Sequence, residues 1–223
     1  MPIFKCSSGL VCFYHVPKCG GTTVESTLVD SGYELSFLDL GFWENKHEVW
    51  YKSSPQHITY KDFDLLFKSD IFFYTFTVVR NPVTRFLSAY NYNRARIGKY
   101  ISFESFLTKL EKNAASKNDF FGARFDNHFL PTNRFVPKTC DIFYLEDNLT
   151  DLEEALSEKL GTKIKFLEKQ NVKSYNIRIQ AGIKGFVKKI LIPPSPKKPE
   201  LSEELILKIQ NLYKEDYERF NFR

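Results

Sequence analysis

The sequence has no long hydrophobic run. Its longest apolar stretch, residues 71–79, is far shorter than the roughly 20 residues that a membrane-spanning helix needs. The first residues, MPIFKCSSGLVCF, contain no apolar core long enough for a secretory signal. We therefore predict a cytoplasmic location, or a catalytic domain given without its anchor.

Cysteine is also scarce, and the four residues are Cys6, Cys12, Cys19 and Cys140. They form no CxxC pair and have no histidines at zinc-ligand spacing, which argues against a structural zinc site and a dense disulfide framework. Free thiols in a reducing compartment are expected. No cluster of metal ligands is visible in the sequence, and we predict that the protein needs no metal.

Positive charge exceeds negative charge only modestly: 32 Lys and Arg against 27 Asp and Glu give a net charge of +5 over 223 residues. The basic residues are spread along the chain, so they suit an anionic ligand without requiring nucleic acid, and an ordinary solvated surface explains them equally well. We predict no nucleic-acid partner. The length fits one domain spanning 1–223, and the oligomeric state is not indicated.

Strand-like and helical segments alternate along the chain. Short runs rich in β-branched and aromatic residues predict strands at 10–16, 71–79 and 142–145, and 55–60 is expected to be extended. Amphipathic or capped segments predict helices at 22–29, 61–67, 83–93, 102–112, 149–160 and from 202 onward. This order predicts an α/β fold, with a central parallel sheet flanked by helices and ligands bound outside the carboxyl ends of the strands.

The turn after the first of these strands has the features of a phosphate-binding loop. A strand, a tight turn and a helix start direct backbone N–H groups and the positive end of the helix dipole at one point, which favours an anion. Lys18 adds a positive charge, and the hydroxyls of Thr22 and Thr23 add donors. The predicted loop residues are Lys18, Cys19, Gly20, Gly21, Thr22 and Thr23.

The spacing within this loop argues against two common phosphate-binding motifs. A Walker A loop places its Lys after the last Gly, whereas Lys18 precedes Gly20. A cysteine phosphatase loop needs an Arg six residues after its Cys, but Glu25 stands at that offset from Cys19. ATP or GTP hydrolysis and cysteine-dependent phosphatase chemistry are therefore disfavoured.

A second loop of similar design follows the strand at 71–79. Arg80 leaves the strand, Pro82 suits the first position of a helix, and Ser88 lies two turns further on. Because both loops follow strands of one predicted parallel sheet, we expect Lys18 and Arg80 to face the same crevice. Two anion sites on neighbouring strand ends suit a nucleotide with phosphates at both ends.

Together, V-P-K-C-G-G-T-T and V-V-R-N-P-V-T-R-F-L-S-A-Y resemble the two motifs of the membrane-type carbohydrate sulfotransferase family, as does the ending L-Y-K-E-D-Y-E-R-F-N-F. The resemblance implies a P-loop-like sulfotransferase fold and the donor 3′-phosphoadenosine 5′-phosphosulfate. It implies that the first motif, with Lys18, holds the 5′-phosphosulfate, and that Arg80 and Ser88 hold the 3′-phosphate.

The resemblance also suggests a catalytic base. Q-H-I-T-Y-K-D-F is similar to a region of heparan sulfate 2-O-sulfotransferase whose histidine is the base, so His57 inherits that role, with a plain structural role as the alternative. An imidazole suits the task because a sugar hydroxyl must lose its proton as it attacks sulfur. Lys18 would meet the charge that grows on the leaving nucleotide.

Two further segments resemble the family less closely. His128, in D-N-H-F-L-P-T-N-R-F, lies in a segment similar to the family's N-H-x-x-P-Q, and is predicted either to contact the acceptor or to brace the loop. Arg85 is the other candidate for the acceptor. Asn171 and Ser174 resemble a late N-x-S stretch near the nucleotide.

The leading prediction is sulfuryl transfer to a hydroxyl of a carbohydrate. The basic balance favours an anionic polysaccharide as acceptor, with a lipid-linked sugar, a small glycoside and a peptide tyrosine as alternatives. Two other functions stay open: a nucleotide or small-molecule kinase with a variant phosphate loop, and a nucleotide- or glycan-binding module without turnover. The absence of a GK[ST] sequence argues against the kinase.

Overall fold

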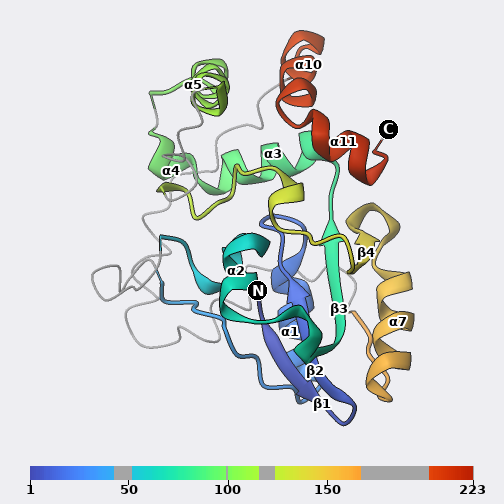
Figure 1. The fold of residues 1–223 in the computed structure, drawn as a ribbon. Helices are drawn as coiled ribbons and strands as arrows, with labels where there is room; N and C mark the ends of the chain where they lie inside the picture. The colour runs from blue at the N-terminus through green and yellow to red at the C-terminus, as the bar shows by residue number, and fades with distance from the viewer. Residues whose placement is uncertain (43–51, 99, 116–123, 167–200, 223) are drawn as a thin grey trace, which may run out of the picture.

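Four strands form one sheet in the order β1-β2-β3-β4 (Figure 1). The computed structural model describes residues 1–42, 52–98, 100–115, 124–166 and 201–222. β2 (Gly9–Tyr14) pairs in parallel with β3 (Phe72–Val79), and β3 pairs in parallel with β4 (Asp141–Tyr144). The predicted parallel sheet is therefore confirmed for these strands.

The edge strand β1 (Ile3–Cys6) was not predicted, and it runs antiparallel to β2. It is too short to show an alternating pattern of its own, and it joins the sheet through a tight turn before Gly9. The register pairs Ile3 with Cys12 and Cys6 with Gly9, so the hairpin covers the side of β2 away from β3. The sheet is consequently mixed rather than wholly parallel.

Helices flank the sheet and form a second layer beyond the carboxyl end of β3 (Figure 1). Most of the predicted helices are confirmed within a few residues. The described helices, of which α4 was not predicted, are α1 (Gly21–Asp30), α2 (Tyr60–Leu66), α3 (Pro82–Tyr92), α4 (Arg94–Ile97), α5 (Phe103–Ala115), α7 (Thr150–Leu160), α10 (Glu203–Leu212) and α11 (Lys214–Phe220).

The extended conformation predicted for 55–60 is wrong. Pro55–His57 forms a turn of 3-10 helix, in which Pro55 occupies the first position and the amide of His57 donates to the carbonyl of Ser54. Thr59 then caps α2, because its hydroxyl oxygen accepts from the amide of Asp62. These two local signals leave only Ile58 and Thr59 extended between the turn and the helix.

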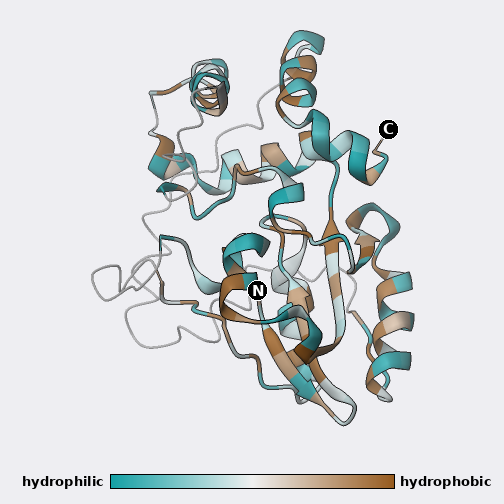
Figure 2. Ribbon diagram, in the orientation of Figure 1, coloured by the Kyte–Doolittle hydropathy of each residue, from teal (hydrophilic) through white to brown (hydrophobic). Residues whose placement is uncertain are grey.

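Two hydrophobic cores hold the described residues together, and Figure 2 shows apolar residues along the strands and on the inner sides of the helices. The first lies on the sheet, where Phe13 and Phe76 stack with ring centroids 5.0 Å apart. The second joins α3, α5 and α10 around Phe86 and Ile209, which are both buried. No helix within the described ranges is both long enough and apolar enough to cross a membrane.

The aromatic segment after α1 contributes to the first core where the structure describes it. Phe37 packs edge-on against Phe63 and Phe67, with centroids 5.7 and 5.3 Å away, and Phe42 is buried. Core packing is therefore the role of Phe37. Trp43, Trp50 and Tyr51 lie outside the described residues.

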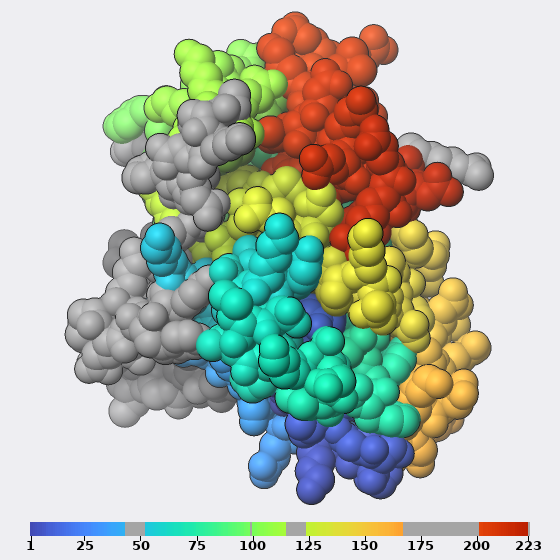
Figure 3. All heavy atoms as spheres, in the orientation of Figure 1, coloured from blue at the N-terminus to red at the C-terminus, as the bar shows by residue number. Residues whose placement is uncertain are grey.

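The C-terminal helices hold the loop that carries His128. The carboxylate of Asp216 on α11 accepts hydrogen bonds from the amides of Thr132 and Asn133, at 2.7 and 2.8 Å. The hydroxyl of Tyr213 donates to the carbonyl of Phe129 at 2.9 Å. In Figure 3 the chain around residues 125–145 forms a band between the C-terminal helices and α2. The ending of the sequence thus positions a loop more than 80 residues earlier.

Candidate functional site

The two predicted anion loops meet at one edge of the sheet. β2 and β3 are parallel neighbours, so the segments that follow Tyr14 and Val79 emerge side by side. The guanidinium of Arg80 donates from Nη1 to the carbonyl oxygen of Lys18 at 3.4 Å, and from Nε to the hydroxyl of Thr84 at 3.0 Å. The structure therefore brings Lys18 and Arg80 together, as the sequence predicted.

The first loop leaves the start of α1 open to a ligand. Gly20 is the N-cap in a left-handed conformation, with φ 84°, and no side chain caps the helix. The first turn contains no acidic residue. The first backbone N–H groups of a helix have no acceptor within it, so this uncapped end provides donors and a positive dipole for an anion.

Gly21 is required because the loop lies directly on a buried histidine. A Cβ at this position would overlap the imidazole ring of His15, and one at Gly20 would come within 2.9 Å of the Leu145 side chain. His15 itself is fixed by a hydrogen bond between its Nδ1 and the Glu25 carboxylate, at 2.6 Å. The loop therefore approaches the sheet as closely as a backbone without side chains allows.

Substituting Gly21→Ala should destabilise the protein by about 1–3 kcal/mol, because the new methyl group can be accommodated only by moving a well-packed ring. A urea titration of both proteins would measure the difference. A Gly21→Ala protein as stable as the wild type would show that His15 does not limit this position.

Lys18 is a largely buried cation that has no partner of opposite charge among the described residues. Burial, together with the nearby Arg80, lowers the pKa of Lys18 to about 8. Its ammonium lies 4.0 Å from the ring centroid of Tyr92 on α3, and within the described residues it forms no ion pair with a carboxylate. A desolvated positive charge in this state favours the binding of an anion.

His57 is held by a buried carboxylate. Its Nδ1 lies 2.7 Å from Oδ2 of Asp126, a residue 69 positions later in the chain. Burial by itself would raise the pKa of Asp126, but the charge and the hydrogen bond of His57 outweigh it and hold that pKa well below its ordinary value. Asp126 is therefore ionised and accepts the bond, so Nδ1 of His57 carries the proton.

A row of aromatic rings connects His57 to Lys18. The His57 ring contacts those of His15 and His128, with centroids 4.8 and 5.0 Å apart. His128 in turn lies 5.0 Å from Tyr92, the ring that carries the Lys18 ammonium. The predicted base and the predicted phosphate-binding lysine thus belong to one continuous site.

Comparison with known proteins agrees with this geometry. The model of the sulfotransferase family matches residues 3–223. The chain belongs to the sulfotransferase family. This membership supports sulfuryl transfer as the general activity, and with the mixed α/β structure it confirms the predicted fold class. Neither a curated protein nor a solved structure matches the chain.

His128 of this sulfotransferase is buried and neutral. Its Nδ1 lies 2.8 Å from the side-chain nitrogen of Asn93, which also donates to the carbonyl of Ala89. An amide nitrogen only donates, so Nδ1 accepts and the proton of His128 sits on Nε2. Burial, followed by the charge of His57, lowers the pKa of His128 well below its ordinary value.

Arg85 is 1% exposed, which argues against the acceptor contact predicted for it. Its Nη2 donates to the carbonyl of Leu130 at 2.7 Å and its Nη1 to that of His128 at 3.4 Å. Arg85 therefore braces the loop that contains His128. Ser88 is half-buried on α3, one turn beyond Thr84 and so on the helix face that carries the Arg80 contact.

Three side chains in this site have the composition of a metal site. One ligand atom each of His57, Asp126 and His128 lie within 4.8 Å of one another. Hydrogen bonds already engage these groups, however: Asp126 accepts from His57 and from the amide and hydroxyl of Ser54. Nδ1 of His128 already accepts from Asn93 and its Nε2 carries a proton, so neither nitrogen has a free lone pair for a metal ion. This bonding pattern fits a hydrogen-bonded cluster better than a cation site.

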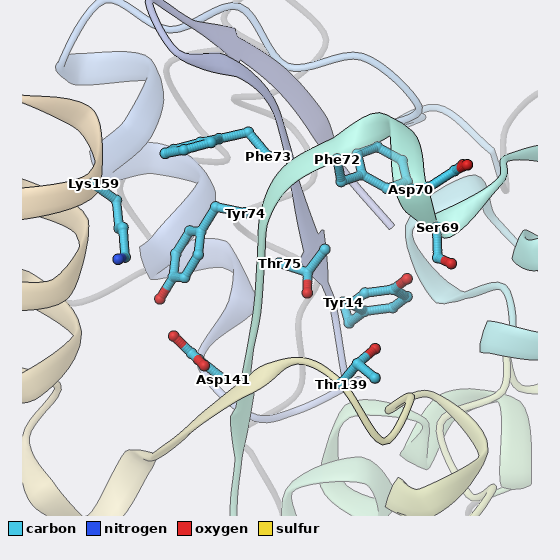
Figure 4. A pocket seen from close by; sticks show the side chains of 10 residues that line it. All are labelled: Tyr14, Ser69, Asp70, Phe72, Phe73, Tyr74, Thr75, Thr139, Asp141 and Lys159. Carbon is cyan, nitrogen blue, oxygen red and sulfur yellow. The ribbon is translucent and has the colours of Figure 1, made fainter.

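The predicted site does not coincide with a cavity that lies elsewhere among the described residues. An open cavity of about 340 Å³ lies beside the first half of β3 and the start of β4. Figure 4 shows the hydroxyl of Tyr74 and the carboxylate of Asp141 pointing toward each other across it, with Lys159 nearby. None of the predicted site residues lines this cavity.

Sequence reasoning missed Asp126, Tyr92 and Asn93, which orient or contact the predicted residues. Only the sequence D-N-H marked Asp126, and nothing local marked its contact with His57. Asn171 and Ser174 lie outside the described residues.

Proposed function

We propose that this protein transfers a sulfuryl group from 3′-phosphoadenosine 5′-phosphosulfate to a carbohydrate hydroxyl. The observation that supports it most is the pairing of an uncapped helix start with two cations, Lys18 and Arg80, on adjacent loops. Neither cation forms an ion pair with a carboxylate in the described part of the chain. A donor with anionic groups at both ends would supply the missing negative charge.

The fit of the donor rests on the shape of the loop as well as on charge. Gly20 and Gly21 let the loop lie directly against Leu145 and His15, and this placement sets the start of α1, whose first N–H groups suit a phosphosulfate. The hydroxyls of Thr22 and Thr23 lie in the first turn of the same helix and are half-buried. We assign this loop to the 5′ end, and Arg80 with Ser88 to the 3′-phosphate.

In the proposed reaction His57 accepts a proton at Nε2 from the acceptor hydroxyl. The hydroxyl oxygen forms a bond to sulfur as the bond from sulfur to the 5′-phosphate oxygen breaks. Lys18 stabilises the negative charge that develops on that departing oxygen, so adenosine 3′,5′-bisphosphate leaves. The base contributes roughly 10²–10⁴-fold to such a reaction, and the transfer requires no change of oxidation state.

A carbohydrate acceptor is supported by an exposed aromatic ring beside the reacting groups. Tyr92 is 58% exposed, and its ring contacts both Lys18 and His128. Flat aromatic faces offer apolar area to the C–H faces of sugars while their hydroxyls stay in reach of polar groups. The net charge of +5 favours an anionic polysaccharide among carbohydrates.

Adenosine 3′,5′-bisphosphate should raise the melting temperature more than adenosine 5′-monophosphate or ATP at equal concentration. At about 100 times its dissociation constant a ligand stabilises by about 2.7 kcal/mol. That gives roughly 5–11 °C for a chain of this size. A thermal shift assay measures the effect.

The Arg80→Ala variant provides the matched control for the thermal shift. It should lose the preference for the bisphosphate over the monophosphate, because only the bisphosphate carries the 3′ group assigned to Arg80. A response to ATP alone would favour the kinase. Stabilisation by none of the nucleotides would contradict the proposed donor.

A further inference from the structure

We propose that Asp126 is a positioning residue that fixes His57 in the tautomer with a free Nε2, and that Asn127 holds the same segment in place. The inference rests on the proposed function, because it names the group that prepares the proposed base. Asp126 itself would not touch the substrate, since its carboxylate lies behind His57 and is 4% exposed.

The tautomer follows from the chemistry of the two partners. An ionised carboxylate has acceptors only, so the 2.7 Å contact with His57 requires a proton on Nδ1. A neutral imidazole then has its lone pair on Nε2, the nitrogen that can receive a proton. His128 has the opposite tautomer, because its Nδ1 accepts from Asn93. The two neighbouring histidines therefore differ at Nε2: that of His57 can accept a proton, whereas that of His128 already carries one.

The carboxylate is itself fixed by the segment that contains His57. The amide and the hydroxyl of Ser54 donate to the two oxygens of Asp126, at 2.6 and 2.8 Å. Asn127 donates from its side chain to the carbonyl of His57 at 2.8 Å. Two consecutive residues of the D-N-H sequence therefore hold the turn 54–57 at both of its ends.

The backbone of the D-N-H sequence is strained at Asp126 and Asn127, the two residues that hold the turn 54–57. Asp126 and Asn127 both adopt left-handed conformations, with φ 54° and 60°. Residues other than glycine seldom adopt this region twice in succession, and the surroundings must sustain the cost. The conformation is what directs both side chains toward the same turn.

The other groups around His57 do not supply the charge that Asp126 supplies. His15, paired with Glu25, and His128 both contact its ring, and burial lowers the pKa of each. Neither imidazole therefore places a positive charge beside His57. The amino group of Met1 donates to the carbonyl of Pro55 rather than to the ring. Among the residues that the structure describes, the carboxylate of Asp126 is the charged group that His57 contacts directly.

The test compares Asp126→Asn with the matched variant Ser54→Ala. The second variant removes one hydrogen bond to Asp126 but keeps the carboxylate against His57. In ¹⁵N-histidine spectra of the full chain, recorded in mildly alkaline buffer and assigned with His57→Gln, wild-type His57 should show the Nδ1–H tautomer. Asp126→Asn should populate the Nε2–H tautomer, whereas Ser54→Ala should not.

Turnover is measured as release of adenosine 3′,5′-bisphosphate from the phosphosulfate donor, with a panel of neutral and anionic polysaccharides. Asp126→Asn should lower kcat by about 10-fold or more, because a base in the wrong tautomer loses part of its contribution to the rate. The KM of the donor should not change. Ser54→Ala should retain most of kcat, because the Ser54 amide still donates to Asp126 and the carboxylate keeps its contact with His57.

A wild-type His57 in the Nε2–H tautomer would overturn the inference, as would an equal loss of kcat in both variants. If Asp126→Asn does not fold, the wild-type spectrum and the Asp126→Glu variant test the inference instead, because Glu has the same negative charge as Asp. If no acceptor is sulfated, the proposed function fails. The tautomer of His57 still tests the positioning role independently of that failure.

Discussion

Replacing His57 with Gln should lower kcat by about 10²–10⁴-fold and leave the binding of adenosine 3′,5′-bisphosphate unchanged. Glutamine is close to histidine in size and keeps a donor for the Asp126 carboxylate, so the cluster with Ser54 can persist. It has no basic nitrogen, however, and the acceptor hydroxyl would have to lose its proton to water. Steady-state turnover and isothermal titration with the bisphosphate separate the two effects.

His128→Gln is the control that distinguishes the two neighbouring histidines. Nε2 of His128 already carries a proton, since Nδ1 accepts from Asn93, so this residue cannot serve as the base in its observed state. Its replacement should therefore reduce kcat less than that of His57. If His128→Gln causes the larger loss while His57→Gln stays active, the roles assigned to these rings are reversed.

The phosphate loops could be predicted because their signals are local. Lys18, Gly20 and Gly21 stand directly after an apolar run, and Arg80 and Pro82 repeat that order after β3. Parallel pairing of the strands then follows from their alternation with helices, and it places both loops at one edge. In this part of the site, short segments of sequence contain nearly all the information.

The remainder of the site depends on contacts between distant segments. The contact of His57 with Asp126 joins residues 69 apart, and that of Asp216 with Thr132 joins residues 84 apart. Periodicity and capping describe neighbours along the chain, so they give no signal for such pairs. Arg85 illustrates the same limit: a basic residue after a strand suggests a ligand, but tertiary packing directs it to the carbonyl of Leu130.

Lys18→Ala should reduce turnover by at least about 10²–10³-fold, the loss observed when one donor to a developing negative charge is removed. Binding of the bisphosphate should weaken as well, because the ammonium also faces the product. Lys208→Ala is the matched control: it removes the same charge from an exposed pair with Glu204 on α10, and should leave turnover unchanged. Equal activity of Lys18→Ala and the wild type would contradict the proposed mechanism.

The lowered pKa of Lys18 gives this prediction a pH dependence. Burial lowers that pKa to about 8, so in the free protein Lys18 is charged below pH 8 and becomes neutral above it. Phosphate monoesters stay doubly ionised above about pH 7, so their own charge is constant in this range. Affinity for the bisphosphate should therefore fall as the pH rises from about 8 to 9.5. Lys18→Arg keeps its charge throughout, so its affinity should not change with pH over the same range. A decline of the same size in both proteins would assign the titration to a group other than Lys18.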